Sequence, residues 1–236
     1  MKSLIIGNGE IGYSLYNVLS ETHETYVRDI EDLKVDGIEV MHICFPYSKK
    51  FVDYVKKYQR EYNPKYTIIH STVPIGTSTK CNAYNSPVRG IHPHLERSFK
   101  CFIKYLAPKN QELKEYFEKA GIPIKEVEKP ETTEAAKLYC TTIYGLNIIA
   151  EKECYNFCKN YGLDYEIVYQ DMNETYNEGY DKLGFPQFKK YVLKHIDGDI
   201  GGHCIVPNCD LLQTPIAKFI LSQNRNFKCS DGKCEI

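Results

Sequence analysis

The sequence has no excess of charge of either sign. Its 236 residues include 30 Lys and Arg against 31 Asp and Glu, and 42% are hydrophobic. A disordered chain has fewer apolar residues and more net charge, and a protein that binds nucleic acid through phosphate contacts usually has an excess of basic residues. The composition therefore excludes both classes and is that of an ordinary globular protein.

Long hydrophobic runs are also lacking. No stretch reaches 18 apolar residues, and the start of the chain turns polar before a signal-peptide core is complete. We therefore expect no membrane span and no export signal, and we place the protein in the cytoplasm. Its ten cysteines are scattered singly rather than spaced as a disulfide framework, so most are expected to be buried thiols.

Residues 1–129 alternate short apolar runs with helical patterns. Strands are expected at 2–7, 25–29, 40–45 and 66–70, with further candidates at 88–91 and 122–127, and helices at about 10–19, 51–63 and 111–120. Strands that alternate with helices predict a parallel sheet. The first part of the chain is therefore predicted to be an α/β domain.

The pattern changes from residue 130 on. Apolar or small residues recur about every 3.5 positions from Thr132 to Tyr161, which predicts one long helix, capped by Thr132 or Thr133 and ended by Gly162. At 1.5 Å per residue this helix is on the order of 45 Å long, so we expect it to pack against a second subunit in a homodimer. Residues 130–236 are predicted to form a smaller all-helical domain. Its other elements are helices at 164–176, 186–193 and 210–222, a glycine-rich loop at 197–204 and a polar tail.

A glycine-rich turn stands between the first strand and the first helix. Gly7-Asn8-Gly9-Glu10-Ile11-Gly12 fits G-x-G-x-x-G, and Asp29 ends the next strand. The glycines allow a pyrophosphate to approach the helix N-terminus, and the acid can accept both ribose hydroxyls. This context predicts a dinucleotide-binding Rossmann domain over 1–129; the alternative is a turn that has lost its ligand. Asp29 favours NAD over NADP because it repels a 2′-phosphate, an argument that the neighbouring Arg28 weakens.

Two polar loops follow later strands. Residues Ser71 to Thr77, with hydroxyls at Ser71, Thr72 and Thr77, lie where ligands of open parallel sheets bind, unless they simply cap a helix. The segment His92-Pro-His94-Leu-Glu96 brings two imidazoles and a carboxylate together. We interpret it as a polar loop on the substrate side. No third ligand cluster at a defined spacing supports a metal site there.

The segment Gly201-Gly-His203-Cys204 is the most specific context for a thiol in the chain. Two glycines let the backbone approach a ligand, and an adjacent histidine or a nearby lysine would favour the nucleophilic thiolate of Cys204. The alternative is one more structural thiol. Cys229 and Cys234 lie in the polar tail, where neither a disulfide nor half of a metal site is favoured.

In chain order, these segments resemble the UDP-glucose/GDP-mannose dehydrogenase family, a branch of the 6-phosphogluconate-dehydrogenase-like superfamily. The glycine turn with Asp29 resembles the family's NAD fingerprint, and Val40–Pro46 resembles its strand that ends in a Val-Pro type turn. Ser71–Thr77 is similar to its S-T-V-P-x-G-T signature. Glu134–Leu138 is similar to the start of its central helix, which carries a lysine, and Gly201–Cys204 to its G-G-x-C loop. The resemblance covers about residues 1–220.

The resemblance implies an NAD-dependent dehydrogenase that oxidises a primary alcohol, for example of a sugar or a sugar nucleotide, to a carboxylate. Lys137 would stabilise an alkoxide or oxyanion, Cys204 would form a thiohemiacetal and then a thioester, and Thr72 would hold water or the cofactor near the reacting carbon. The implied cofactor residues are Gly7, Asn8, Gly9, Glu10, Ile11, Gly12, Asp29, Phe45, Pro46 and Ser71. The implied substrate residues are His92, His94, Glu96, Thr141, His203 and Asn208.

The sequence departs from the family at two polar positions and in length. Thr141 and Asn208 stand where the family has an asparagine and an aspartate, so two partners of the oxyanion and the water are altered. The family's C-terminal nucleotide-sugar domain has no room in this chain, which favours a substrate other than a nucleotide sugar. Two alternatives therefore stand beside the main interpretation: a β-hydroxyacid-type dehydrogenase that transfers one hydride, and a nucleotide-binding protein without turnover.

Overall fold

The computed structural model describes residues 1–91, 93–202 and 204–227. The chain divides into two compact units, Met1–Lys137 and Leu138–Ile236. His92, His203, Cys229 and Cys234 lie outside the described residues. Among the residues that are described, no helix is both long and apolar enough to cross a membrane.

The first unit is built on a parallel sheet of five strands. The strands are β1 (Lys2–Ile6), β2 (Glu24–Arg28), β3 (Val40–Ile43), β4 (Tyr66–Ile69) and β5 (Tyr84–Asn85), in the spatial order β2-β1-β3-β4-β5. Leu4 of β1 pairs with Tyr26 on one side and Met41 on the other. The inner strands β1, β3 and β4 are almost entirely buried, because helices cover both faces of a parallel sheet.

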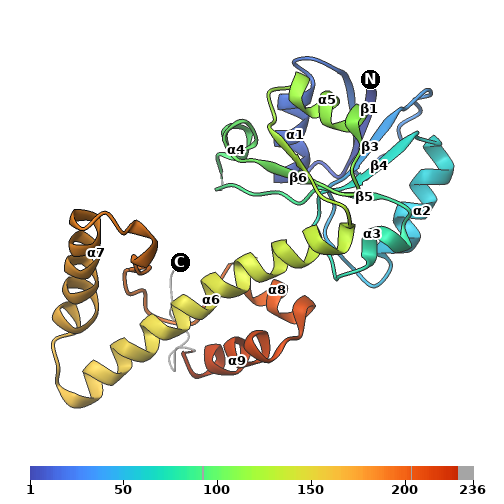
Figure 1. Cartoon of the computed structure of the whole chain (residues 1–236). Coiled ribbons are helices and arrows are strands. Elements are labelled where there is room, and N and C mark those ends of the chain that lie inside the picture. The colour runs from blue at the N-terminus through green and yellow to red at the C-terminus, as the bar shows by residue number, and fades with distance from the viewer. Residues whose placement is uncertain (92, 203, 228–236) are drawn as a thin grey trace. The chain divides into compact units, whose positions relative to one another are not determined.

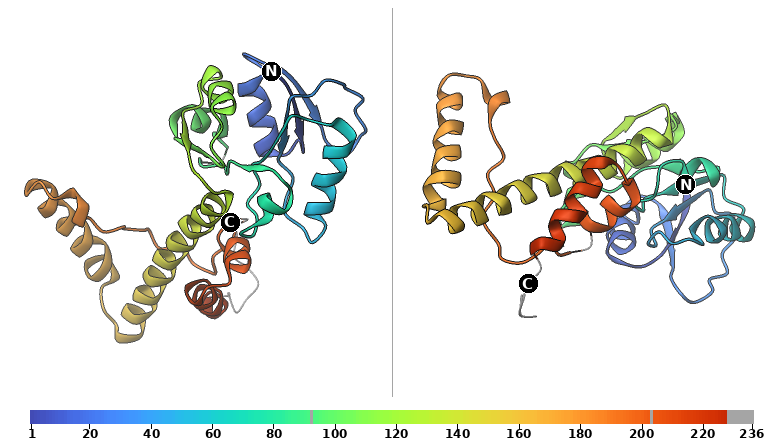
Figure 2. Two further views of the ribbon diagram at one scale, coloured as in Figure 1. Left: turned by 45° about the vertical axis from the view of Figure 1, so that its right-hand side comes forward. Right: turned by 90° about the horizontal axis from the view of Figure 1, so that it is seen from below.

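Two apolar layers hold these helices on the sheet (Figures 1 and 2). On one face lie α1 (Glu10–Leu19), α4 (Leu95–Cys101) and α5 (Gln111–Lys119), which bury Leu15, Phe99 and Phe117. On the other face lies α2 (Phe51–Tyr62), which buries Phe51 and Val55. The short helix α3 (Thr77–Lys80) precedes β5, and β6 (Lys104–Leu106) pairs with β7 (Ile124–Glu126) in a second sheet.

The second unit is helical. The long helix α6 (Pro130–Tyr161) begins in the first unit and is about 48 Å long at 1.5 Å per residue. It is followed by a π-helical segment (Glu166–Asp171), α7 (Met172–Lys182), a 3-10 turn (Pro186–Phe188), α8 (Ile205–Leu212), α9 (Pro215–Asn224) and a last 3-10 turn (Arg225–Phe227). The predicted fold class, a Rossmann-type parallel sheet followed by a smaller helical domain with one long helix, is confirmed.

Several element predictions were wrong in detail. Residues 88–91 form no strand, and α6 starts at Pro130 rather than at a threonine cap. The predicted helix at 186–193 is only the 3-10 turn, because the segment after Phe188 is irregular. The helix predicted at 210–222 is two helices, since Thr214 caps a new one and Pro215 occupies its first turn.

Candidate active site

The conformation of the turn between β1 and α1 requires glycine at positions 7 and 12. Gly7 has φ +99°, and a Cβ there would lie 3.0 Å from the backbone nitrogen of Phe45. A Cβ on Gly12 would lie 1.8 Å from the carbonyl oxygen of Gly7. Only glycine therefore allows this left-handed turn and this close packing of helix on strand. The Gly7 N–H donates to the carbonyl of Arg28 at 2.8 Å, which joins the turn to β2.

Gly9 differs from the other two glycines because a Cβ there would meet nothing within 4 Å. It is the residue before α1, and no side chain caps this helix end. The first N–H groups of a helix lack partners within the helix and favour an anion. Beside this open space, the Asn8 N–H donates to Asp29 Oδ1 at 3.2 Å. A dinucleotide, which needs a close backbone approach at its pyrophosphate and an acid at its ribose, fits these residues.

The loops after β3 and β4 meet at the same edge of the sheet. The Ser71 hydroxyl donates to the carbonyl of Phe45 at 2.6 Å, so the Phe45–Pro46 turn and the Ser71–Thr72 loop are joined. The Phe45 ring packs on Phe51 of α2, with centroids 4.9 Å apart. The predicted cofactor residues from these loops and from the glycine turn thus stand at the carboxyl ends of neighbouring strands, where ligands of such sheets bind.

The N-terminal part of α6 is anchored to the loop after β4. Glu134 is 2% exposed, and its carboxylate accepts the Gly76 N–H at 2.6 Å and the Ser78 N–H at 2.8 Å. Burial raises the pKa of Glu134, and the hydrogen bonds from Ser78 and Gly76 oppose that rise. Lys137 follows three residues later on α6 and is half-buried.

A buried lysine that the sequence analysis missed lies in the same unit. Lys104 is 4% exposed, and its ammonium donates to the carbonyls of Ser86 at 2.7 Å and Pro87 at 3.3 Å. Burial lowers the pKa of Lys104 to about 7, and the charge of Lys137 adds to the lowering. In the sequence, only its position within an apolar run indicated that Lys104 is buried.

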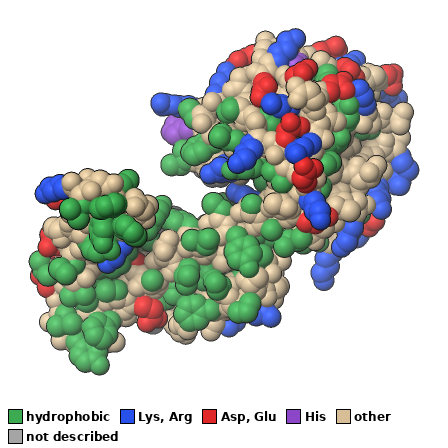
Figure 3. Space-filling model, viewed as in Figure 1, with side chains coloured by type: hydrophobic (Ala, Val, Ile, Leu, Met, Phe, Trp, Pro, Cys, Tyr) green, Lys and Arg blue, Asp and Glu red, His purple; other side chains and the backbone are tan. Residues whose placement is uncertain are grey.

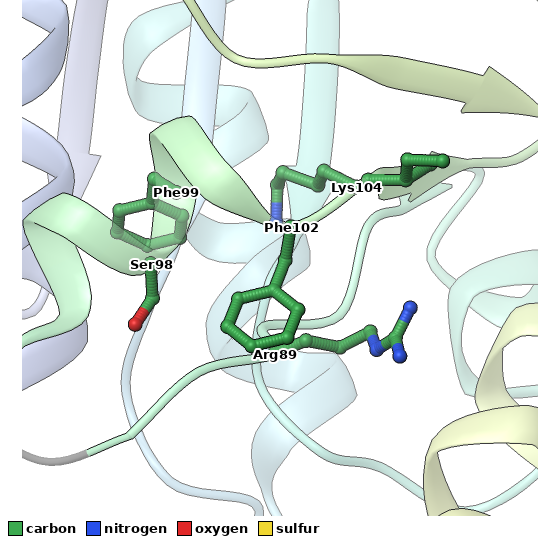
Figure 4. Close-up of a pocket in the computed structure, with 6 residues that line it drawn as sticks. Arg89, Ser98, Phe99, Phe102 and Lys104 are labelled. Atoms are coloured by element: carbon green, nitrogen blue, oxygen red, sulfur yellow. The ribbon is translucent and has the colours of Figure 1, made fainter. Parts of the chain in front are cut away.

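Figure 4 shows Lys104 near Arg89 and Phe102. The Arg89 guanidinium carbon lies 5.8 Å from the ring centroid of Phe102. The hollow between these side chains has no room for a water molecule, so it is a feature of packing and holds no ligand.

In the second unit, Cys204 stands exposed directly before α8. Its carbonyl accepts the Asn208 N–H at 3.1 Å, and the Asn208 side-chain amide donates to the Thr141 hydroxyl at 2.7 Å. The two positions that depart from the family are therefore bonded to each other, and Asn208 lies one helical turn after Cys204. Thr141 in turn lies one helical turn after Lys137 on α6.

Glu96 takes part in a different contact. Its carboxylate accepts the side-chain amide of Asn17, on α1, at 2.5 Å, so α4 holds Glu96 against α1. His94 is exposed at the start of α4, and its carbonyl accepts the Ser98 hydroxyl. Whether His94 and Glu96 contact a substrate stays a prediction.

Neither the models of known protein families nor the curated proteins match this sequence. Solved structures do match. The 3-hydroxyisobutyrate dehydrogenase of Mycobacterium tuberculosis is 12% identical with a TM-score of 0.68, over 96% of this chain and 94% of that one. A UDP-glucose dehydrogenase of Pyrobaculum islandicum is 13% identical with a TM-score of 0.70, over 96% and 68%.

A third structure is an NDP-N-acetyl-D-galactosaminuronic acid dehydrogenase of Methanosarcina mazei Go1. It is 12% identical with a TM-score of 0.67, over 95% of this chain and 66% of that one. The alignments extend over nearly the whole of this chain, both the sheet and the helices that follow. This chain therefore shares the fold of these dehydrogenases.

Proposed function

We propose that the protein is an NAD-dependent dehydrogenase that oxidises the primary alcohol of a polar small molecule, such as a sugar or sugar nucleotide, to a carboxylate. One observation carries this proposal. The glycine turn leaves open space at Gly9, at the start of α1, and beside it the Asp29 carboxylate accepts the Asn8 N–H. A pyrophosphate and a ribose need this pair of features. NAD is preferred because a 2′-phosphate would face the Asp29 carboxylate.

The site residues divide the work as follows. When bound, NAD supplies the acceptor for the hydride of each oxidation. Gly7–Gly12, Asp29, Phe45, Pro46 and Ser71 hold it at the edge of the sheet. The Lys137 ammonium stabilises the alkoxide of the alcohol, and Thr72 orients water or the cofactor near the reacting carbon. Supporting this role, Glu134 lies three residues before Lys137 on α6 and bonds to Gly76 and Ser78, just after Thr72 in the chain.

Cys204 makes the second oxidation possible. Its thiolate adds to the carbonyl carbon of the aldehyde and gives a thiohemiacetal. In this adduct, as in an alcohol, one carbon carries both a hydrogen and a hydroxyl group, so a hydride can leave it as the C=O bond forms. Loss of that hydride leaves a thioester, and water then releases the carboxylate and the free thiol. Asn208, one turn after Cys204 on α8, bonds to Thr141 of α6, and these two residues stand where the family has its partners of the oxyanion and the water.

A second candidate is a β-hydroxyacid-type dehydrogenase that transfers one hydride and does not use Cys204. The extent of the likeness favours it: this chain covers 94% of the 3-hydroxyisobutyrate dehydrogenase but 68% of the UDP-glucose dehydrogenase. The first of these structures was solved with L-serine, itself a β-hydroxy acid. A nucleotide-binding protein without turnover is the remaining alternative, because Thr141 and Asn208 replace the family's residues.

The proposed function includes a cytoplasmic location and a homodimer. Eight cysteines are described, and all eight are free thiols, as in a protein of a reducing compartment. The exposed apolar side chains of α6 support the dimer.

A count of NADH formed per substrate molecule separates the candidates. We would incubate the protein with NAD and a panel of sugars, sugar nucleotides and β-hydroxy acids, and follow NADH absorbance and product mass. The proposal predicts two NADH and a carboxylate. Cys204→Ser should stop at one NADH and an aldehyde, Lys137→Ala should give none, and Cys101→Ser, at another exposed thiol, should change nothing.

The alternatives give different results in the same experiment. One NADH per β-hydroxy acid, with Cys204→Ser fully active, would establish the single-hydride enzyme. Binding of NAD without NADH formation from any member of the panel would favour the binding protein.

A further inference from the structure

Arg28 is the last residue of β2 and adjoins Asp29. An arginine at this point of a dinucleotide site can bind the 2′-phosphate of NADP. Side chains alternate between the two faces of a sheet, and Val27 packs with the α1 and α5 face while Tyr26 packs with the α2 face. Arg28 points to the α2 face with Tyr26, and it is only 4% exposed.

Four side chains contact the Arg28 guanidinium group, whose Nε has no hydrogen-bond partner among the described residues. One terminal nitrogen donates to Glu61 and, at 2.6 Å, to the Tyr62 hydroxyl, and the other donates to Asp32. The guanidinium carbon lies 5.0 Å from the centroid of the Tyr58 ring. Both ion pairs therefore involve a cation that is almost fully enclosed, whereas Asp32 is largely exposed and Glu61 is partly so.

This arrangement gives the two neighbouring residues opposite roles. The Asp29 carboxylate is held at the glycine turn by the Asn8 N–H, on the side of the ligand. The Arg28 charge is offset by two carboxylates on the side of α2. Turning Arg28 toward a ligand would break both ion pairs and leave Glu61 without its cation. The 2′-phosphate of NADP would therefore face the Asp29 carboxylate and would have no contact with the Arg28 guanidinium.

We propose that Asp32 and Glu61 are specificity-determining residues, which hold Arg28 away from the cofactor and so reserve the adenosine end of the site for a nucleotide with a free 2′-hydroxyl. The proposal rests on the proposed function, because it requires a dinucleotide at the glycine turn. On this proposal two features weaken the binding of NADP: the charge of Asp29 and the enclosure of Arg28.

The test removes the ion-pair partners of Arg28 in a variant that already lacks the Asp29 carboxylate. In Asp29→Ser, we would replace Asp32 by Asn and Glu61 by Gln, and titrate NAD and NADP by calorimetry. A buried guanidinium without anions is unstable, so it should move outward and bind the 2′-phosphate. NADP should bind about tenfold more tightly than to Asp29→Ser alone, a change that one new charged contact can supply. A further Arg28→Met change should remove this gain.

Two controls keep the outcome clear. Asp36→Asn in place of Asp32→Asn removes the same charge from an exposed position in the same loop, and it should give a smaller gain. Where the combined variant melts early, Asp29→Ser with Glu61→Gln alone keeps the Asp32 pair and should show part of the gain.

Equal NADP affinity with and without the release, or a gain that persists after Arg28→Met, would overturn the proposal. Failure of the unmodified protein to bind NAD would instead overturn the proposed function and the proposal together. The titration of the unmodified protein distinguishes the two failures.

Discussion

At the scale of single residues, the core of the first unit contains a chain of polar side chains. Tyr116 OH bonds to His42 Nε2, His42 Nδ1 to His70 Nε2, and His70 Nδ1 to the carbonyl of Ser86, each at 2.9 Å. A carbonyl only accepts, so His70 Nδ1 carries the hydrogen and its Nε2 accepts from His42. Tyr116 then donates to His42. Every member is satisfied while both histidines are neutral.

These neutral histidines predict a loss of stability in acid. Burial lowers the pKa of His42 to about 3 and that of His70 well below its usual value. Below pH 6.5 the unfolded chain binds protons that the folded chain does not, so stability falls from pH 6.5 down toward pH 3. We expect His42 to cost roughly 1.5 kcal/mol between pH 6.5 and 5, and His70 to add a loss of the same sign. Urea unfolding at both pH values measures the loss.

Two variants test the source of this acid sensitivity. His42→Leu should be less stable at pH 6.5, since the Tyr116 hydroxyl and His70 Nε2 lose their bonds to His42, but it should lose less stability on going to pH 5. His94→Gln, at an exposed histidine, should keep the full pH dependence. The same dependence in His42→Leu and the unmodified protein would contradict the account.

The cysteines should differ widely in reactivity. Burial raises the pKa of Cys44 to about 12 and that of Cys81 to about 11, so both should resist alkylation at neutral pH. Cys204 is exposed, and we expect it to react with iodoacetamide faster than the other nine thiols, as peptide mass spectrometry would show. Lys137→Ala should slow it if the two residues act together. Equal rates at Cys204 and at the exposed Cys101 would speak against a nucleophilic role.

At the scale of elements, the packing of α6 on α8 and α9 depends on Gly145. A Cβ there would lie 2.6 Å from Ile205 Cγ2 and 3.6 Å from Ile220 Cγ2. Alanine in a helix normally gains up to about 1 kcal/mol over glycine, but overpacking against a branched side chain costs about 1–3 kcal/mol. Gly145→Ala should therefore lower the unfolding free energy.

Gly179→Ala on α7 is the matched comparison, because a Cβ there meets nothing within 4 Å. It should raise the unfolding free energy by about 0.5–1 kcal/mol. Urea unfolding compares the two variants. A similar gain in both would mean that α6 is not packed closely at Gly145.

Local signals predicted some helix ends and not others. Gly162 was predicted to end α6, and it has φ +65° while the Leu163 N–H donates to the Cys158 carbonyl at 2.9 Å, as in a Schellman motif. The break between α8 and α9 was missed, although Thr214 and Pro215 are a common helix start. The apolar pattern runs on through both helices and outweighed that signal.

The long-range contacts of the candidate site could not be predicted from the sequence. The glycine turn and Asp29 were predictable because a strand, a turn and a helix are local. Glu134, in contrast, bonds to Gly76, 58 positions earlier, and Asn208 bonds to Thr141, 67 positions earlier. Spacing along the chain gives no sign of such partners, which exist only after packing.

At the scale of the whole molecule, the second unit exposes many large apolar side chains. Figure 3 shows hydrophobic side chains gathered over α6 and α7. On α6 they include Ile143, 56% exposed, Phe157, 51% exposed, and Tyr161, 71% exposed. Patches of this kind mark interaction surfaces in most proteins. We propose that a second copy of the chain covers the face of α6.

Light scattering at micromolar concentration should therefore give about twice 27.3 kDa. Phe157→Glu with Tyr161→Glu should shift the mass toward one chain. Tyr54→Glu, at an exposed aromatic residue on α2, should leave the dimer intact. A monomer in the unmodified protein would show that this face does not join two copies.

The central claim is that a nicotinamide dinucleotide binds across the glycine turn, and calorimetric titration of NAD into the unmodified protein and Gly9→Val tests it most directly. Gly9 has φ −69°, and a Cβ there meets nothing within 4 Å, so valine should leave the melting temperature unchanged while filling the space for the pyrophosphate. We predict one saturable NAD site per chain in the unmodified protein and binding weaker by at least about tenfold in Gly9→Val. No saturable binding in the unmodified protein, or equal binding in a folded Gly9→Val, would contradict the claim.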